Sequence, residues 1–473
     1  MKRFFWDELE QWYSGGMEIP LMVIGARQVG KTYLIDKFCK SHFKKYCYIN
    51  LMQDQDFVNA FHTLPDFASK VLYLESKYNV KLDDAEVILF VDEVQESEEF
   101  IESLKFFCES EKKYKIVCAG SLLGVKLKRD FSSSFPVGKV EIKYMYPMSF
   151  QEFLEATGNV RYIKLIQDSF INNQPLIESL HKILLNYYHQ FLFLGGMPGC
   201  VLSFVKNNQD FISMDNNIIQ NIIQSYFNDM SKYNSQKNES LRIARIYQNI
   251  PSQLAKENQK FTFAKIDAKD NRKRDYITAV DWLLASNLIL PCYEVTNPIF
   301  PVLGYVNYEN YKLYMNDTGI LCSMLQITDH EVLFDGDYPY KGVLTENYVA
   351  SEFYKNNFPL LYWTRKGENK ALSEVDFLIQ IGSDVIPVEV KANHSTQSKS
   401  LNVYNEKYHP KYAIRISSKN FGFENNIKSI PLYAVFCVQD LIKLETSKAQ
   451  EKIQQQKNDL KKAEKEIDNY LNK

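Results

Sequence analysis

The chain has 473 residues, which is enough for three or four domains of ordinary size. Hydrophobic residues make up 45% and charged residues 24% of the chain, as in globular proteins with full apolar cores. The formal net charge of −2 excludes a uniformly basic nucleic-acid binder but permits a local basic patch.

The N-terminal segment and the cysteines indicate where the protein works. Residues 1–12 read MKRFFWDELEQW, with acids where a secretion signal would need an apolar stretch. Apolar runs such as 87–91 are too short to span a bilayer. The eight cysteines stand singly, without a C-x-x-C pair. We therefore expect a cytoplasmic protein with reduced thiols, no membrane association and no zinc site.

A glycine-rich segment between two regular elements is the first functional motif. The apolar run 19–24 precedes GARQVGKT, and a helical pattern follows at Leu34, Ile35 and Phe38. A buried strand, a glycine loop and a helix form the context of a phosphate-binding loop. We expect this loop to bind ATP through Gly25, Ala26, Arg27, Gln28, Val29, Gly30, Lys31 and Thr32.

Individual residues of the loop have distinct expected roles. Gly25 and Gly30 let the backbone curl so that its N–H groups face the phosphates. Lys31 places a positive charge at the β- and γ-phosphates, and the Thr32 hydroxyl coordinates Mg²⁺.

Residues 87–93 read VILFVDE, an apolar run that ends in two carboxylates. Such a run suits a central parallel strand, and ligands bind at the carboxyl ends of such strands. We expect Asp92 to hold Mg²⁺ through its water shell and Glu93 to polarise the attacking water.

A further apolar run, Ile116–Ala119, leads into Gly120 and Ser121. Ser121 is either a sensor of the γ-phosphate or a helix N-cap, and the sequence leaves both interpretations open. Strands are also predicted at Tyr46–Leu51 and Val140–Tyr144. Residues 1–146 are thus expected to form an α/β ATPase core around a five-stranded parallel sheet.

The middle of the chain is predicted to be mostly helical. Ser149 and Glu152 form the S-x-x-E pattern of a capping box, and GGMPG at 195–199 interrupts the helices that follow. Residues 147–236 are interpreted as a helical lid.

Residues 237–330 read as three helices (Leu241–Lys256, Phe263–Asp267 and a pattern from Tyr276 to Leu288) that lead into a β-hairpin, which resembles a winged helix. Basic residues at the start of its third helix either contact DNA phosphates or are a solvated helix start; they are Arg272, Lys273 and Arg274.

Four residues in the region 331–443 predict a second acidic centre. Glu389 and Lys391 share one face of a strand, and Asp376 heads the partner strand of the hairpin. Glu346 lies on the inward face of an upstream helix, where a lone carboxylate is costly. The three carboxylates would bind Mg²⁺, with Lys391 orienting or deprotonating the attacking water.

Two alternatives to a working centre stay open. The strand face can be a surface ion-pair ladder, or the fold can persist after its chemistry is lost.

The last region, 444–473, is predicted to be a helical tail, because Ile453, Leu460 and Ile467 are seven residues apart. That spacing fits a short coiled coil or a solvated amphipathic helix.

From about residue 18 to 400 the chain resembles a family of prokaryotic AAA-type ATPases with a C-terminal PD-(D/E)XK nuclease-like domain. The resemblance rests on the order of GARQVGKT, ILFVDEVQ, CAGSLLG, YPMSFQEFL, FLGGMPG, KLYMNDTGIL, GVLTENYVASEF, KGENKALSEVDFLI and IPVEVKA. It implies an AAA core, a winged-helix region and a nuclease-like domain. Family members often carry a Gly-Arg pair near the last core strand, where the arginine is a possible arginine finger. This chain has Gly138 and Lys139 there, and a lysine cannot make the forked contact of a guanidinium group. Arg129 is a poor candidate for the same role.

These observations favour two classes of function. In the first, ATP hydrolysis with Mg²⁺ drives action on nucleic acid, DNA rather than RNA, through the nuclease-like centre. In the second, the protein is an ATP-dependent switch or scaffold whose C-terminal domain binds nucleic acid or protein without cutting. Because the Gly-Arg pair is missing, we expect at most a nucleotide-dependent homo-oligomer.

Overall fold

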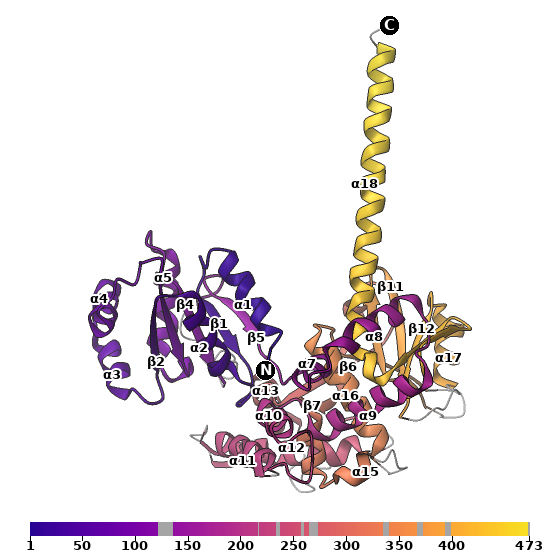
Figure 1. Cartoon of the computed structure of the whole chain (residues 1–473), viewed down its shortest axis with the longest axis horizontal. Coiled ribbons are helices and arrows are strands. Elements are labelled where there is room, and N and C mark those ends of the chain that lie inside the picture. Colours follow the sequence, from indigo (N-terminus) through magenta and orange to yellow (C-terminus); the bar gives the residue numbers. More distant parts are fainter. Residues whose placement is uncertain are drawn as a thin grey trace. The chain divides into compact units, whose positions relative to one another are not determined.

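The computed structural model describes residues 1–121, 136–215, 217–232, 237–256, 260–263, 273–333, 340–366, 372–392 and 399–471 (Figure 1). The chain divides into two compact units. The first unit comprises residues 1–159, 189–291 and 312–340, and the second comprises 160–188, 292–311 and 341–473.

The first unit contains a five-stranded sheet in the order β2-β3-β4-β1-β5. Every neighbouring pair is parallel, which confirms the predicted five-stranded parallel sheet. The strands are β1 (Leu21–Ile24), β2 (Lys45–Asn50), β3 (Val87–Asp92), β4 (Ile116–Gly120) and β5 (Glu141–Tyr144). The strands β1, β3 and β4 are buried throughout, because helices cover both faces of a parallel sheet.

The helices around this sheet are α1 (Phe5–Ser14), α2 (Lys31–His42), α3 (Gln55–Thr63), α4 (Phe67–Tyr78), η1 (Val94–Glu96) and α5 (Glu98–Glu109). Helix α2 contacts β2, β3 and β4. Side chains of α3, α4 and α5, among them Phe57, Leu74 and Leu104, form one apolar core with Leu89 and Val91 of β3. This packing holds the carboxyl ends of the central strands at one edge.

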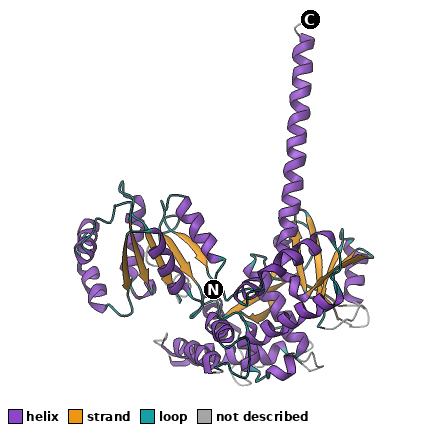
Figure 2. Ribbon diagram, in the orientation of Figure 1, coloured by secondary structure: helices purple, strands orange, loops and turns teal. Residues whose placement is uncertain are grey.

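The rest of the first unit is mostly helical (Figure 2). Its helices are α7 (Phe150–Ala156), α10 (Pro198–Lys206), α11 (Asn217–Lys232), α12 (Lys237–Leu254), α13 (Lys273–Ala285), α14 (Thr318–Met324) and α15 (Asp329–Leu333). The capping box of Ser149 and Glu152 is confirmed at the start of α7. The predicted break at 195–199 is also confirmed, because α9 (Glu178–Leu194) ends there and α10 begins at Pro198.

The second unit contains a mixed sheet in the order β10-β11-β12-β14-β13. The predicted hairpin is confirmed, since β10 and β11 pair antiparallel around Gly382, whose φ of +61° suits a tight turn. The strands are β10 (Phe377–Ile381), β11 (Asp384–Val390), β12 (Ala413–Ser417), β13 (Gly422–Glu424) and β14 (Ile427–Pro431). The helices of this unit include α8 (Val160–Asn172), α16 (Lys341–Lys355), α17 (Lys399–Tyr408) and η4 (Leu432–Cys437).

A further four-stranded sheet has the order β7-β6-β8-β9. Its strands are β6 (Ile289–Val295), β7 (Val306–Met315), β8 (Leu361–Lys366) and β9 (Leu372–Val375), and η3 (Val302–Tyr305) precedes β7. The run α12, α13, β6, β7 has the element types expected of a winged helix. The intervening segment predicted at 263–267 lies outside the described residues beyond Phe263. The winged helix and the finer domain boundaries therefore stay predictions.

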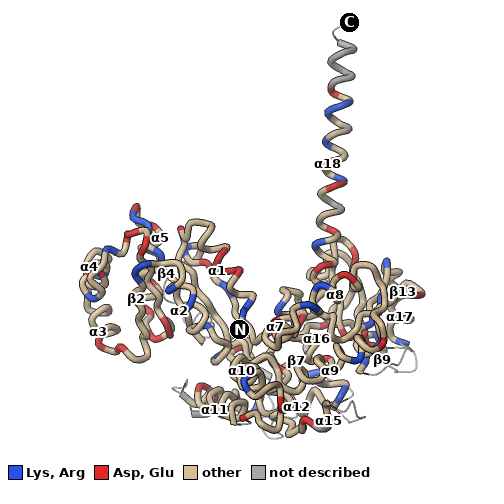
Figure 3. Tube along the Cα trace, viewed as in Figure 1, with Lys and Arg blue, Asp and Glu red and all other residues tan. Residues whose placement is uncertain are grey.

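The C-terminal helix α18 (Val438–Leu471) is continuous over 34 residues. Its first turns contact η4 and β10. Farther along, Ile453 and Leu460 are exposed, and both basic and acidic residues lie along the described part of the helix (Figure 3). Across the described parts of the chain, no helix combines the length and hydropathy needed to cross a bilayer.

Candidate functional site

The predicted nucleotide residues meet at one edge of the parallel sheet. The loop 25–32 follows β1, Asp92 ends β3, and Ser121 follows β4. In the register of the sheet Ile24 lies beside Gly120, and Asn50 of β2 lies beside Asp92. Because all strands are parallel, their carboxyl ends place these polar residues together at the start of α2.

The backbone of the loop has the curvature of an anion-binding nest. Gln28 and Gly30 have φ values of +65° and +93°, alternating with residues of ordinary φ. Such an alternation turns successive N–H groups to one side. At Gly25 a Cβ would lie 2.1 Å from the carbonyl oxygen of Met145, so this position accepts only glycine. The loop conformation therefore requires glycine at Gly25 and favours it at Gly30.

Lys31 is buried and its ammonium group donates to the carbonyl oxygens of Gly25 and Ala26, at 2.8 and 2.9 Å. Burial lowers the pKa of Lys31 to about 8, although the charges of Glu93 and Asp92 oppose the shift. The group is therefore held inside the loop, close to both acids, where a phosphate charge would stabilise its protonated form.

Asp92 and Thr32 form the oxygen pair that a divalent cation would need. The Thr32 hydroxyl donates to Asp92 Oδ2 at 2.8 Å, and the Tyr48 hydroxyl donates to the same oxygen at 3.2 Å. Burial, together with the charge of Glu93, raises the pKa of Asp92, although the Thr32 bond opposes this shift. Hydroxyl and carboxylate oxygens are the donors that Mg²⁺ prefers, so the residues fit that ion.

Glu93 is held by a neighbour that sequence reasoning missed. Its backbone is left-handed, with φ +52°, and its Oε2 accepts a hydrogen bond of 2.6 Å from Gln95 Nε2. Gln95 is buried in η1. The motif ILFVDEVQ contains this glutamine, but its contact depends on the turn after β3, which spacing alone does not predict.

Ser121 is buried, and its hydroxyl has no hydrogen-bond partner among the described residues. The segment that follows, 122–135, lies outside the described residues, and so does Arg129. A buried hydroxyl at the end of β4 suits the sensor interpretation, while the N-cap interpretation stays open. Lys139 pairs with Glu109 of α5 at 3.1 Å.

The C-terminal candidates are gathered around β11. Glu389 is 4% exposed and Glu346 of α16 is 8% exposed, so a solvated ion-pair ladder is excluded for both. Lys391 pairs with Glu389 Oε1 at 2.6 Å, and Asp376 Oδ2 accepts from the Val390 amide at 2.7 Å. Burial lowers the pKa of Lys391, but the charges of Glu389, Asp376 and Glu346 together raise it above its usual value.

The metal centre expected at Glu346, Asp376 and Glu389 stays a prediction, and the charges of all three acids act on Lys391. Among the described residues, no three acidic, histidine or cysteine side chains are arranged to hold a metal. Lys391 contacts one oxygen of Glu389, and the Val390 amide donates to one oxygen of Asp376. The second oxygen of Glu389, Oε2, is buried without a hydrogen-bond partner among the described residues.

The predicted basic patch cannot be placed. Arg272 lies outside the described residues, and so do the side chains of Lys273 and Arg274 at the start of α13.

Comparisons with known families define the class of the first domain. Residues 18–154 match a family described as AAA domain, which covers the loop, both acids and Ser121. The N-terminal domain is therefore an AAA-type P-loop ATPase domain. Residues 185–331 and 341–435 match two families that are each described as a domain of unknown function. A comparison with curated proteins gives no match.

Similar solved structures include a Walker-type ATPase of Pyrococcus abyssi, with 16% identity, 68% of this chain and 94% of that chain covered, and a TM-score of 0.40. The RuvB Holliday junction branch migration motor of Thermotoga maritima is 12% identical, with 60% of this chain and 88% of that chain covered and a TM-score of 0.29. A signal transduction ATPase with numerous domains from Pyrococcus horikoshii has 11% identity, 74% and 45% coverage, and a TM-score of 0.25. Similarities at this level carry no argument about function.

Proposed function

We propose that the first unit binds ATP with Mg²⁺ at the loop 25–32 and hydrolyses it. Lys31 neutralises charge on the β- and γ-phosphates, while Thr32 and Asp92 hold the cation that the nucleotide brings. Glu93 polarises the attacking water, and Ser121 contacts the γ-phosphate.

The observation that carries this proposal is the 2.8 Å hydrogen bond between Thr32 and Asp92, formed beside the buried ammonium group of Lys31. These residues come from two different strand ends, 60 residues apart. Their convergence next to a backbone nest supports a site for a triphosphate and its cation, rather than an ordinary polar turn.

The test measures ATP binding and ATP turnover in the wild type, Lys31→Ala and Glu93→Gln. Lys31→Ala should lose tight ATP binding, since the charge at the phosphates is gone. Glu93→Gln should bind ATP but hydrolyse it at least about 100-fold more slowly, because the general base is lost. Lys44→Ala is the matched control, since Lys44 is an exposed lysine that pairs with Glu86. Turnover near wild type in Glu93→Gln would refute the assignment of the base.

For the second unit we favour the switch or scaffold class over cleavage. The support is that, among the described residues, no group of three acidic, histidine or cysteine side chains is found that could hold a metal ion. In this proposal nucleotide binding in the first unit controls the association of the second unit with nucleic acid, DNA rather than RNA. Retention of a labelled DNA duplex by the full chain with ATP, but not without it, is the expected result.

Assembly is a separate proposal. An arginine finger is an arginine of one subunit that reaches the ATP site of the next, and Lys139, which lacks the guanidinium fork and pairs with Glu109 of its own chain, is a poor substitute for one. We expect at most a nucleotide-dependent homo-oligomer. Sedimentation that shows a monomer with full ATPase activity at every concentration would exclude a shared site.

A further inference from the structure

Two neighbouring carbonyl groups of the phosphate loop are held from outside the loop. The Arg27 carbonyl oxygen accepts a hydrogen bond of 3.1 Å from the Tyr226 hydroxyl. The Val29 carbonyl oxygen accepts one of 2.7 Å from Arg3 Nη1. Both donors come from segments far from the loop in sequence, and the family match to an AAA domain begins only at residue 18.

These two bonds determine where the following amide groups point. In a planar trans peptide the carbonyl and the next N–H point in opposite directions. The hydrogen bonds hold the carbonyl groups of Arg27 and Val29 away from the concave side of the loop. The N–H groups of Gln28 and Gly30 therefore point toward that concave side. Both residues have positive φ, as the nest requires.

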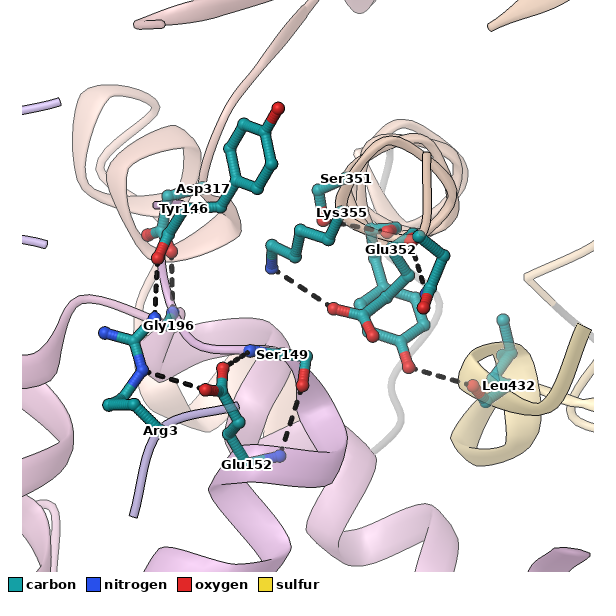
Figure 4. A network of polar contacts seen from close by, with 12 residues as sticks. Arg3, Tyr146, Ser149, Glu152, Gly196, Asp317, Ser351, Glu352, Lys355 and Leu432 are labelled. Atoms are coloured by element: carbon teal, nitrogen blue, oxygen red, sulfur yellow. Dashed lines mark hydrogen bonds and ion pairs between the residues drawn. The ribbon is translucent and has the colours of Figure 1, made fainter. Parts of the chain in front are cut away.

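Arg3 is itself immobilised by several partners. It is 7% exposed, and its Nη2 donates to the Tyr146 carbonyl at 2.7 Å (Figure 4). Its Nε pairs with Glu152 at 2.9 Å. Glu152 also accepts from the backbone amides of Phe4 and Ser149, at 2.7 and 2.8 Å. The rigid guanidinium fork thus joins the phosphate loop to the first turn of α7.

Tyr226 is held equally firmly on α11. It is 1% exposed, and burial raises the pKa of its hydroxyl well above the usual value, so the group remains a donor. Three residues farther along the helix, Asp229 pairs with the Arg27 side chain at 2.9 Å. Helix α11 therefore holds Arg27 by both its backbone and its side chain.

We propose that Arg3 and Tyr226 are positioning residues that preorganise the Gln28 and Gly30 amides for the phosphates of ATP. The inference rests on the proposed ATP site and adds two residues that lie outside the loop. A preorganised cradle needs no reordering when the phosphates arrive, so its loss weakens binding more than turnover.

The experiment measures binding of ATP and of inorganic tripolyphosphate by calorimetry, and ATPase kinetics, in Arg3→Lys and Tyr226→Phe. Each variant should bind both ligands roughly three- to tenfold more weakly, the usual effect of losing one hydrogen bond. The KM for ATP should rise while kcat stays within about twofold, since the reacting groups are untouched. Tyr247→Phe is the control, because its buried hydroxyl has no partner among the described residues.

Each outcome has a defined meaning. Weaker binding of both ligands in Tyr226→Phe, but not in Tyr247→Phe, at unchanged melting temperature supports the proposal. Wild-type affinity in a folded Tyr226→Phe and a folded Arg3→Lys overturns it. If Arg3→Lys does not fold, Tyr226→Phe alone decides. Failure of the wild type to bind either ligand would instead refute the proposed ATP site, and this inference with it.

Discussion

Gln95 and Glu93 are joined by a hydrogen bond of 2.6 Å between Nε2 and Oε2. The donor is buried in η1, and Glu93 lies between the end of β3 and the start of η1. This hydrogen bond restrains the orientation of the Glu93 carboxylate, whose residue has a left-handed backbone conformation. Gln95 is therefore a positioning residue for the proposed general base.

The first prediction concerns this contact. Gln95→Ala should lower kcat roughly 10-fold or more and leave the KM for ATP nearly unchanged, because the base is misplaced while the phosphate contacts remain. Gln95→Glu should be worse, since a second carboxylate beside Glu93 adds repulsion. Steady-state ATPase kinetics provide the test. A Gln95→Ala variant with wild-type kcat would show that Glu93 needs no such support.

The second prediction concerns the GGMPG turn. A Cβ on Gly196 would lie 2.1 Å from the Met148 carbonyl oxygen, and the Gly196 amide already donates to Asp317 at 2.6 Å (Figure 4). Gly196→Ala should lower the free energy of unfolding by at least about 1–3 kcal/mol, because backbone must move. Gly342→Ala is the control, since nothing lies within 4 Å of its added Cβ. Equal urea midpoints for the two variants would contradict this packing.

The third prediction concerns pH and Lys428. This buried lysine donates to the Phe170 carbonyl at 2.8 Å and to the Asn173 side chain, near the C-terminal end of α8. Burial lowers its pKa from 10.5 to about 8. Between these two pH values the unfolded chain binds more protons at this lysine than the folded chain does. The lysine therefore makes the free energy of unfolding increase as the pH rises.

The check compares urea unfolding of the wild type and Lys428→Met from pH 7 to 10. The wild type should gain stability relative to the variant above about pH 8, with no relative change below it. Parallel curves over the whole range would show that the pKa of Lys428 is not lowered in the folded protein.

The fourth prediction separates a structural role of Asp376 from a catalytic one. Asp376→Ala removes the acceptor of the Val390 amide and should cost about 1–3 kcal/mol of stability, whereas Asp376→Asn keeps an acceptor and should cost less. Neither variant nor the wild type should cut plasmid DNA or single-stranded RNA with Mg²⁺ or Mn²⁺. Metal-dependent cleavage by the wild type that is lost in Asp376→Ala would restore the nuclease interpretation.

The sequence by itself determined the five strands of the parallel sheet, the loop after β1, and the two acids at the end of β3. In VILFVDE an apolar run ends in two acids, which predicts the carboxyl end of a buried strand. A strand that helices cover on both faces carries apolar residues along its length, and polar residues appear where the chain leaves the sheet. Likewise, the capping box at Ser149 and the break at 195–199 are local patterns, and both are confirmed. Local backbone chemistry was sufficient for these features.

Only the tertiary structure decided which distant groups support or oppose these motifs. Arg3, Tyr226 and Gln95 leave no periodic or spacing signal, because their contacts depend on where separate segments pack. The same reason applies to the side-chain contacts of the second acidic centre. Sequence placed Glu389 and Lys391 on one strand face, but the pairing of that lysine with that carboxylate, at 2.6 Å, depends on side-chain positions that only folding determines.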